Sequence, residues 1–138
     1  MYSIGEMSRR TGVKIPTIRF YETRGLLATP PRTAGNQRRY DRAALDRLGF
    51  IRHARDLGLP LEDVAALISL HGATGAALER AHDIARRQRQ RLRERIVSLQ
   101  RLEAELDRIA TACDGRHEDH VCAVLHAFAS HEDCRGEH

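Results

Sequence analysis

Two cysteines near the carboxyl end of the chain lie nine residues apart and enclose a segment that holds two histidines. Cys113 and Cys122 flank the sequence DGRHEDHV, which contains His117 and His120. Thiolate and imidazole are the side-chain ligands that Zn(II) and its heavier relatives prefer. The spacing therefore predicts a metal-binding loop. The competing interpretation is that both cysteines are small buried hydrophobic residues and that both histidines are solvated.

Basic and aromatic side chains near the amino end have the chemistry of a DNA-contacting surface. Arginine supplies a permanently charged, forked donor for phosphate or guanine, and tyrosine supplies a hydroxyl for phosphate. We expect Phe20 to point inward while its two neighbours point outward. Taken singly, any of the arginines is as well explained by a surface salt bridge. The DNA contacts that we expect come from Lys14, Thr17, Arg19, Tyr21, Arg38, Arg39 and Tyr40.

The net charge of +4 conceals a gradient along the chain. Residues 1–56 carry 12 Lys and Arg against 5 Asp and Glu. Residues 113–138 carry 2 against 6, together with five of the eight histidines. A basic front half suits a partner with a phosphate backbone, and an acidic tail rich in His and Cys suits a cation.

Composition also argues against several classes of protein. The chain has no run of about 18 apolar residues, so a membrane span is not expected. Its start, MYSIGEMSRR, lacks an apolar signal segment, and three cysteines suit reduced thiols, so we expect a cytoplasmic protein. No orienting partner for a Cys–His pair is recognisable, so an enzyme is not expected.

Two short helices joined by a turn must position the first group of basic residues. Ser3 is expected to cap the first helix, and Gly12 is expected to end it in a left-handed conformation. Pro16 is tolerated only in a first helical turn, so the second helix is expected over residues 15–24. The second helix thus carries the basic face.

A wing and two further helices are expected to complete this domain. The segment from Arg32 to Tyr40, with Gly-Asn at its centre, predicts a tight two-stranded wing. Asp41 is expected to cap a third helix that runs to about Asp56, and a fourth helix is expected over residues 61–70.

A long helix is expected from about Gly75 to Ala112. At ~1.5 Å per residue, roughly 37 residues would extend over ~55 Å, which a domain of this size cannot cover. We therefore expect the helix to pair with a second copy, although folding back on its own domain is the alternative. A shorter helix is expected from about Val121 to Ala129. Heptad-like steps in the long helix connect Leu92, Ile96, Leu99, Leu106, Ile109 and Cys113.

The run from Tyr2 to Leu70 resembles the DNA-binding part of the MerR family of bacterial transcription regulators. The matching pieces, in order, are IGEMSRRTGV, TIRFYETRGLL, RTAGNQRRY and LGFIRHARDLGLPLEDV. The resemblance implies a mainly α fold with three parts. These are a winged helix-turn-helix domain at 1–72, a long antiparallel coiled-coil dimerisation helix at 73–112, and a metal-binding loop, short helix and tail at 113–138.

The resemblance also implies a mode of action on promoter DNA. Members of the family bind as homodimers to promoters whose two polymerase elements are spaced too far apart. The dimer bends and untwists the spacer, so that RNA polymerase, an indirect partner, reads both elements. The residues that match the family's recognition helix are Thr17, Arg19 and Tyr21, and those that match its wing are Arg38 and Tyr40.

Metal-sensing members of the family carry paired cysteines at the end of the long helix and just after a loop. Cys113 and Cys122 match this pair, and His117 resembles a loop histidine of zinc sensors. Sensors of divalent ions usually add a third cysteine from the partner subunit, at a position that falls at about Leu78 here. We expect His82, one turn further along the same rigid helix, to replace it. Other candidates are His71, Cys134, His131 and His138.

The sequence therefore predicts a metal-responsive transcription regulator, with activation as the expected outcome. A site built from Cys113, Cys122, His117 and His82 favours Zn(II), and Cd, Pb, Hg and Co are the other divalent candidates. One alternative is a regulator of the same fold that senses redox state, an electrophile or monovalent Cu(I) through the two cysteines. A second alternative is a DNA-binding or metal-buffering protein that does not switch.

Overall fold

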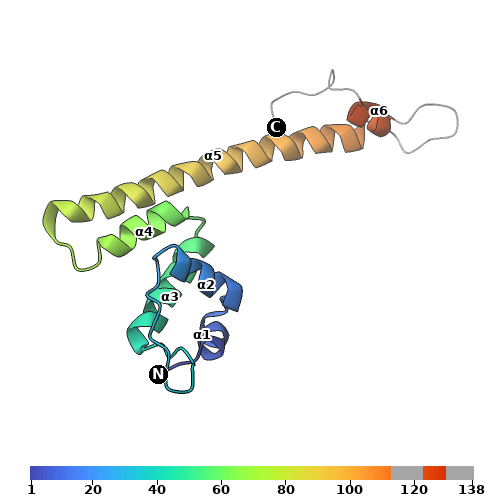
Figure 1. Ribbon diagram of the computed structural model, residues 1–138. Helices are drawn as coiled ribbons and strands as arrows, with labels where there is room; N and C mark the ends of the chain where they lie inside the picture. The colour runs from blue at the N-terminus through green and yellow to red at the C-terminus, as the bar shows by residue number, and fades with distance from the viewer. Residues whose placement is uncertain (113–122, 130–138) are drawn as a thin grey trace. The chain divides into compact units, whose positions relative to one another are not determined.

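The computed structural model describes residues 1–112 and 123–129, which are mainly helical, as predicted. The chain divides into two compact units, Met1–Ala85 and Arg86–His138. Figure 1 labels the α-helices in chain order. They are α1 (Ile4–Thr11), α2 (Ile15–Thr23), α3 (Arg42–Asp56), α4 (Leu61–Ser69), α5 (Leu78–Thr111) and α6 (Ala123–Ala129), and a 3₁₀ turn, η1 (Gly75–Ala77), precedes α5.

Local sequence signals explain where α1 and α2 begin and end. The Ser3 hydroxyl accepts a hydrogen bond from the Glu6 N–H at 3.1 Å and caps α1. Gly12 ends α1 at φ 75°, a left-handed conformation that glycine adopts without a Cβ penalty. Pro16 lies in the first turn of α2, where a missing N–H costs no helical bond. These predicted caps are confirmed.

The later helices follow the predicted bounds with small shifts. Asp41 accepts a 2.8 Å hydrogen bond from the Ala44 N–H and caps α3, as expected. Helix α4 ends one residue earlier than predicted, at Ser69. The long helix begins with the turn η1 and becomes α-helical at Leu78, and α6 covers the described part, Ala123–Ala129, of the short helix that was expected.

One hydrophobic core holds the first unit together. Helix α1 contacts both α2 and α3, and α3 contacts α4. Ile84 of α5 belongs to the same cluster, so the first turns of α5 complete this core. Burying each such large side chain contributes about 1.5–3 kcal/mol. The largest fully buried side chains are Met7, Ile18, Tyr40, Leu48, Ile51 and Val64.

The wing is a tight hairpin whose strands are reduced to single bridges. Arg32 pairs with Arg38, and Tyr2 pairs with Tyr40 through backbone hydrogen bonds of 2.7 and 2.8 Å. Asn36 forms the turn at φ 61°, a left-handed conformation that asparagine tolerates. The predicted hairpin is therefore present, and its pairing with Tyr2 ties it to the start of the chain.

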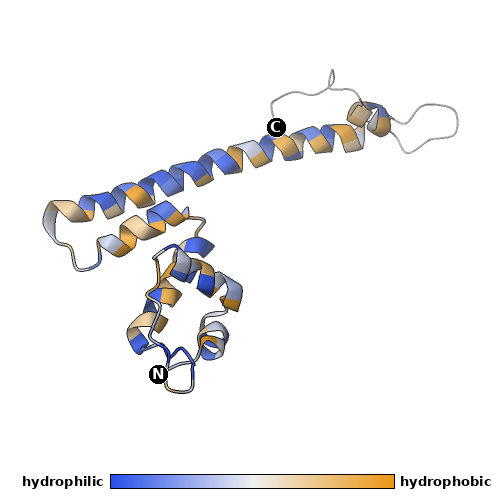
Figure 2. Ribbon diagram, in the orientation of Figure 1, coloured by the Kyte–Doolittle hydropathy of each residue, from blue (hydrophilic) through white to orange (hydrophobic). Residues whose placement is uncertain are grey.

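Helix α5 exposes a row of apolar side chains. Leu92, Ile96, Leu99 and Leu106 are between 47% and 53% exposed in the single chain. Figure 2 shows hydrophobic positions recurring among the hydrophilic residues of α5. Such exposure is unusual for a heptad-like row, which is normally covered by another helix. No helix in the described ranges is long and apolar enough to cross a bilayer.

Candidate nucleic-acid interface

Helix α2 buries one face and exposes the other. Ile18 and Tyr21, three residues apart, lie on the face that packs into the core. Lys14, which precedes the helix as its N-cap residue, and Arg19 are exposed, and Thr17 is half-buried. Lys14 and Arg19 are therefore accessible to a ligand from solvent.

The expected orientation of Phe20 and Tyr21 is wrong. Phe20 is 45% exposed, with the Arg24 guanidinium 5.8 Å from its ring centre, whereas Tyr21 is only 6% exposed. The reason is helical periodicity, because Tyr21 shares the face of Ile18 and Phe20 does not. The Tyr21 side chain packs in the same core cluster as Ile18. Its ring is thus a core residue rather than part of a surface.

Tyr40 also lies inside the protein rather than on the wing's surface, which corrects the second tyrosine prediction. It is among the fully buried side chains, and its hydroxyl donates a 3.0 Å hydrogen bond to Oε1 of Glu22 on α2. Its ring joins the core because the bridge to Tyr2 holds its backbone against the body of the domain. Burial and the adjacent Glu22 raise the pKa of the Tyr40 hydroxyl, while Arg38 acts in the opposite direction.

Glu22 joins α2 to the wing, a role that sequence reasoning missed. Its side chain is only 4% exposed, and Oε1 also accepts from Nη1 of Arg38 at 3.5 Å. The Arg38 side chain is 31% exposed and so remains partly accessible. The only sequence signal was a single carboxylate placed between two basic segments. Its partners lie 16 and 18 residues further along the chain, and nothing local predicted them.

A groove of about 790 Å³ lies between α2 and the wing. Arginines from both elements line it, together with Glu22 and short polar side chains. Arg32 had not been expected as a site residue, and it donates a 3.2 Å hydrogen bond to Oδ1 of Asn36 at the hairpin turn. A hollow lined by guanidinium groups is suited to phosphate. The lining residues that can bond a polyanion are Arg19, Arg32, Arg38, Thr23, Thr29, Asn36 and Gln37.

Further basic groups flank this groove. Arg39 is half-buried and donates to Oε1 of Gln37 at 3.2 Å. The Arg10 guanidinium lies 4.9 Å from the centre of the Tyr2 ring. Hydrogen bonding to Tyr2 and to Asp46 raises the pKa of Arg42.

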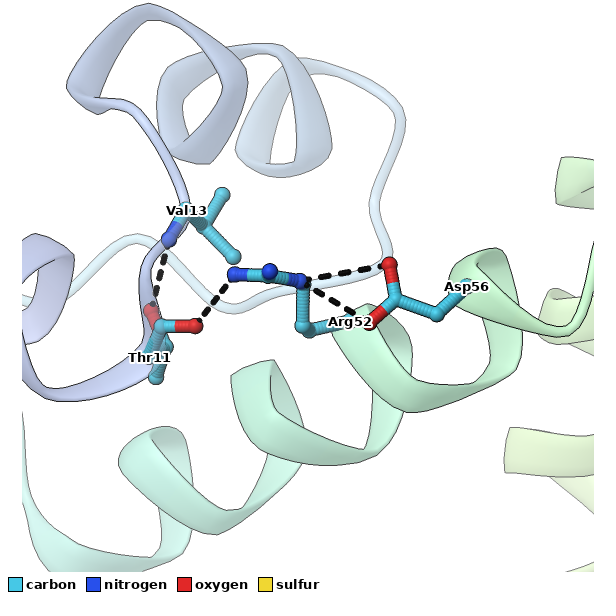
Figure 3. A network of polar contacts seen from close by, with 4 residues as sticks. All are labelled: Thr11, Val13, Arg52 and Asp56. Atoms are coloured by element: carbon cyan, nitrogen blue, oxygen red, sulfur yellow. Dashed lines mark hydrogen bonds and ion pairs between the residues drawn. The ribbon is translucent and has the colours of Figure 1, made fainter.

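Arg52 connects α3 to the turn that precedes α2. Figure 3 shows its guanidinium between the Thr11 carbonyl and the Asp56 carboxylate. In the same turn the Val13 N–H donates to the Thr11 hydroxyl at 3.2 Å. A Cβ added at Gly12 would collide with Nη1 of Arg52, which would have to move aside, and the left-handed φ of 75° itself favours glycine at this position.

The structure describes only some of the predicted metal ligands. Cys113, Cys122 and His117 lie outside the described residues, as do the alternative ligands Cys134, His131 and His138. His82 is exposed on α5, and His71 is exposed beyond the end of α4. Within residues 1–112 and 123–129, no three His, Cys, Asp or Glu side chains gather to hold a metal ion.

Two family models match the chain. One, described as MerR HTH family regulatory protein, matches residues 2–70, and the other, described as MerR, DNA binding, matches residues 45–109. The first match covers α1 to α4 and the wing, and so includes the arginine-lined groove.

Individual relatives align over nearly the whole chain. The mercuric resistance operon regulatory protein of Serratia marcescens is 33% identical over 134 residues, covering 97% of this chain and 92% of the relative. The HTH-type transcriptional regulator ZntR of Escherichia coli K12 is 36% identical over 130 residues, covering 93% and 92%. Among solved structures, the transcription regulator PbrR691 from Ralstonia metallidurans CH34 in complex with lead(II) has a TM-score of 0.77 at 30% identity, covering 93% and 99%.

Proposed function

The chain belongs to the MerR family of helix-turn-helix regulatory proteins, and on that premise we propose that it is a transcription activator controlled by a divalent metal ion, with Zn(II) the first candidate. It binds promoter DNA as a homodimer. Binding of the metal changes how the dimer distorts the promoter spacer, so RNA polymerase is an indirect partner. A promoter regulator acts where the DNA is, which supports the expected cytoplasmic location.

The observation that carries this proposal is the arginine-lined groove between α2 and the wing. It places Arg19, Arg32 and Arg38 around one hollow, although they come from two separate elements. Contacts from a recognition helix and a wing reach two places on a duplex and so set the register of the protein on it. Thr17 and Lys14 add contacts at the start of α2.

The exposed row on α5 supports the homodimer. Leu92, Ile96, Leu99 and Leu106 are half-exposed in one chain, and a second α5 would cover them. Charge along α5 favours an antiparallel pair. Residues 78–95 carry 7 arginines against 3 Asp and Glu, whereas residues 96–111 carry 2 against 3. Antiparallel packing therefore places the strongly basic half of one helix beside the weakly acidic half of its partner.

The donor set supports a divalent metal. Two thiolates and two imidazoles make a mixed tetrahedral set that suits Zn(II), and the related ions Cd, Pb, Hg and Co are further candidates. Cys113, Cys122 and His117 would supply three donors, and His82 of the partner helix would replace the cysteine that is absent at Leu78. One relative is the regulatory protein of a mercuric resistance operon, and one similar structure was solved in complex with lead(II), which supports this class of ligand.

Control by the metal requires a difference in affinity between two states of the dimer. The ion must bind the activating conformation more tightly than the resting one, or no shift follows. A donor from each subunit satisfies this requirement, because closing the loop against the partner helix ties the site to the arrangement of the two chains.

The test is transcription in vitro from the promoter of the regulated operon, with and without added Zn(II). The double variant Cys113→Ser/Cys122→Ser is expected to bind the promoter like the wild type and to lose induction. The control is Cys134→Ser, which removes a thiol outside the proposed donor set. Elemental analysis of the purified protein accompanies the assay. Undiminished induction of the double variant would exclude this metal site.

The presence of Leu78 where a third cysteine was expected favours a second candidate for the signal that the protein senses. Without a third sulfur donor, the pair Cys113 and Cys122 also suits linear Cu(I), a redox change or an electrophile. Induction by Cu(I) or by an oxidant, with Zn(II) inactive, would select this candidate.

A further inference from the structure

We propose that Glu22 is a specificity-determining residue that holds Arg38 at one position and repels misplaced phosphate from the groove. This inference rests on the proposed binding of promoter DNA. Glu22 itself makes no contact with DNA, because its carboxylate is almost completely buried. It acts through Arg38 and through its charge.

The buried negative charge of Glu22 is only partly offset by its hydrogen-bond partners. Oε1 accepts from Tyr40 at 3.0 Å and from Arg38 at 3.5 Å, while Oε2 is buried and has no hydrogen-bond partner among the described residues. A buried carboxylate costs free energy unless it is well paired. Stability alone therefore does not account for a charge here, and the Tyr40 hydroxyl could be satisfied by a neutral amide oxygen.

The position of this charge suggests what it does. Glu22 lines the groove that also contains Arg19, Arg32 and Arg38. Among the described residues that line this groove, it is the one carboxylate. The other three charges attract any phosphate, whatever the shape of the duplex. A fixed negative charge repels a phosphate that enters the groove at a distance from Arg38, where no cation offsets the repulsion. Discrimination between partners commonly relies on such a repulsive element.

The tether on Arg38 adds a geometric requirement. An arginine side chain free in solvent can follow a phosphate over several ångströms, and so accepts many DNA shapes. Arg38 is instead held beside α2, and only about a third of its side chain is exposed. Phosphate contacts set the register of a protein on DNA. A preorganised contact stabilises only the complex in which the duplex places a phosphate beside it. Glu22 thereby couples the wing's cation to the recognition helix.

The test measures specificity rather than affinity. The probes are a fluorescent duplex selected by the wild-type dimer from a random library and a scrambled duplex of the same composition. Glu22→Gln keeps an oxygen for Tyr40 and removes the charge. We expect the scrambled duplex to bind about threefold more tightly and the selected duplex to gain nothing, so that the ratio of the two affinities falls about threefold or more. The control Asp46→Asn removes an exposed carboxylate on α3 that lies outside the groove, and it should leave the ratio unchanged.

A double-mutant cycle identifies the route of the effect. In an Arg38→Gln background, Glu22→Gln should change the ratio less than it does in the wild type, because the tethered partner is gone. Circular dichroism verifies that each variant is folded, and if Glu22→Gln does not fold, Glu22→Asp is used instead, because it draws the carboxylate back from Arg38 and should also lower the ratio. Tyr40→Phe leaves the charge of Glu22 in place and should preserve the ratio.

Three outcomes separate the possibilities. If the wild type does not discriminate between the probes, the proposed function itself fails. If the wild type discriminates and Glu22→Gln does so equally, the inference about Glu22 fails alone. If Glu22→Gln weakens both probes by the same factor, Glu22 is only structural and the inference is again overturned.

Discussion

Nη1 of Arg52 on α3 donates a 2.6 Å hydrogen bond to the carbonyl of Thr11, the last residue of α1. Carbonyls in the last turn of a helix have no partner within the helix and must find one elsewhere. Arg52 supplies that partner from a position 41 residues further along the chain. The orientation of the turn before the recognition helix therefore depends on α3.

Replacing Arg52 by alanine should destabilise the DNA-binding unit. The Thr11 carbonyl would lose a charge-assisted hydrogen bond in a partly buried setting, and we expect the free energy of unfolding to fall by about 1.5–3 kcal/mol. Urea unfolding followed by circular dichroism measures the change. Arg42→Ala is the matched control, since its pair with Asp46 is exposed and should matter little. Equal effects of the two substitutions would contradict the role given to Arg52.

Stability should decline at alkaline pH partly because of Tyr40. Its pKa in the folded protein is raised above the ordinary value of 10.0, chiefly by burial and by Glu22. The neutral hydroxyl is thus favoured by folding. The associated stability is complete below the unfolded pKa and is lost as pH rises through the folded pKa. The difference in unfolding free energy between wild type and Tyr40→Phe should therefore shrink above pH 10, and a constant difference would contradict this.

Arg19→Ala should weaken binding to a duplex selected by the wild-type dimer. Arg19 is exposed on α2 and lines the groove. If Arg19 contacts a base edge, its loss should cost about 1–3 kcal/mol of binding free energy and relax the sequence preference at one position. If it contacts a phosphate, its loss should reduce the slope of log affinity against log salt concentration by about one. Fluorescence anisotropy at several salt concentrations distinguishes the two. Arg101→Ala on α5 is the control, and an equal loss from it would point to general charge.

Leu99→Glu should break the homodimer. Leu99 is half-exposed in the single chain, and burying a charge at the centre of the α5 row would be unfavourable. Analytical ultracentrifugation should show monomers, and binding to a selected duplex should fall with dimerisation. Ser98→Glu adds the same charge one residue earlier, at a position about 100° away around the helix, and should remain dimeric. A dimeric Leu99→Glu protein would indicate that another surface joins the subunits.

His82→Ala should reduce affinity for Zn(II) if His82 supplies the fourth donor. We expect a loss of at least about tenfold, the effect that even an outer partner of a metal ligand has. Competition with a coloured chelator measures it, and His53→Ala, an exposed histidine on α3, is the control. If affinity is retained in His82→Ala, a parallel His71→Ala variant tests the next candidate.

The beginnings and ends of helices could be predicted from the sequence because they depend on neighbouring residues. The Ser3 cap, the left-handed Gly12 and the Asp41 cap each involve groups no more than four residues apart. The exposed Lys14 and Arg19 followed from the basic face of α2. The family was recognisable for a related reason, since its motifs are continuous segments of the chain.

Only the tertiary structure decided which aromatic residues are buried and which distant groups meet. Tyr21 rather than Phe20 packs inward because the core lies against the face of α2 that Tyr21 shares with Ile18, and Tyr40 is buried because its bridge to Tyr2 holds it against the domain. The bonds of Glu22 to Arg38 and Tyr40, and of Arg52 to Thr11, join residues 16 to 41 positions apart. Such pairs form because the packed core brings their backbones together, and no spacing along the chain encodes them.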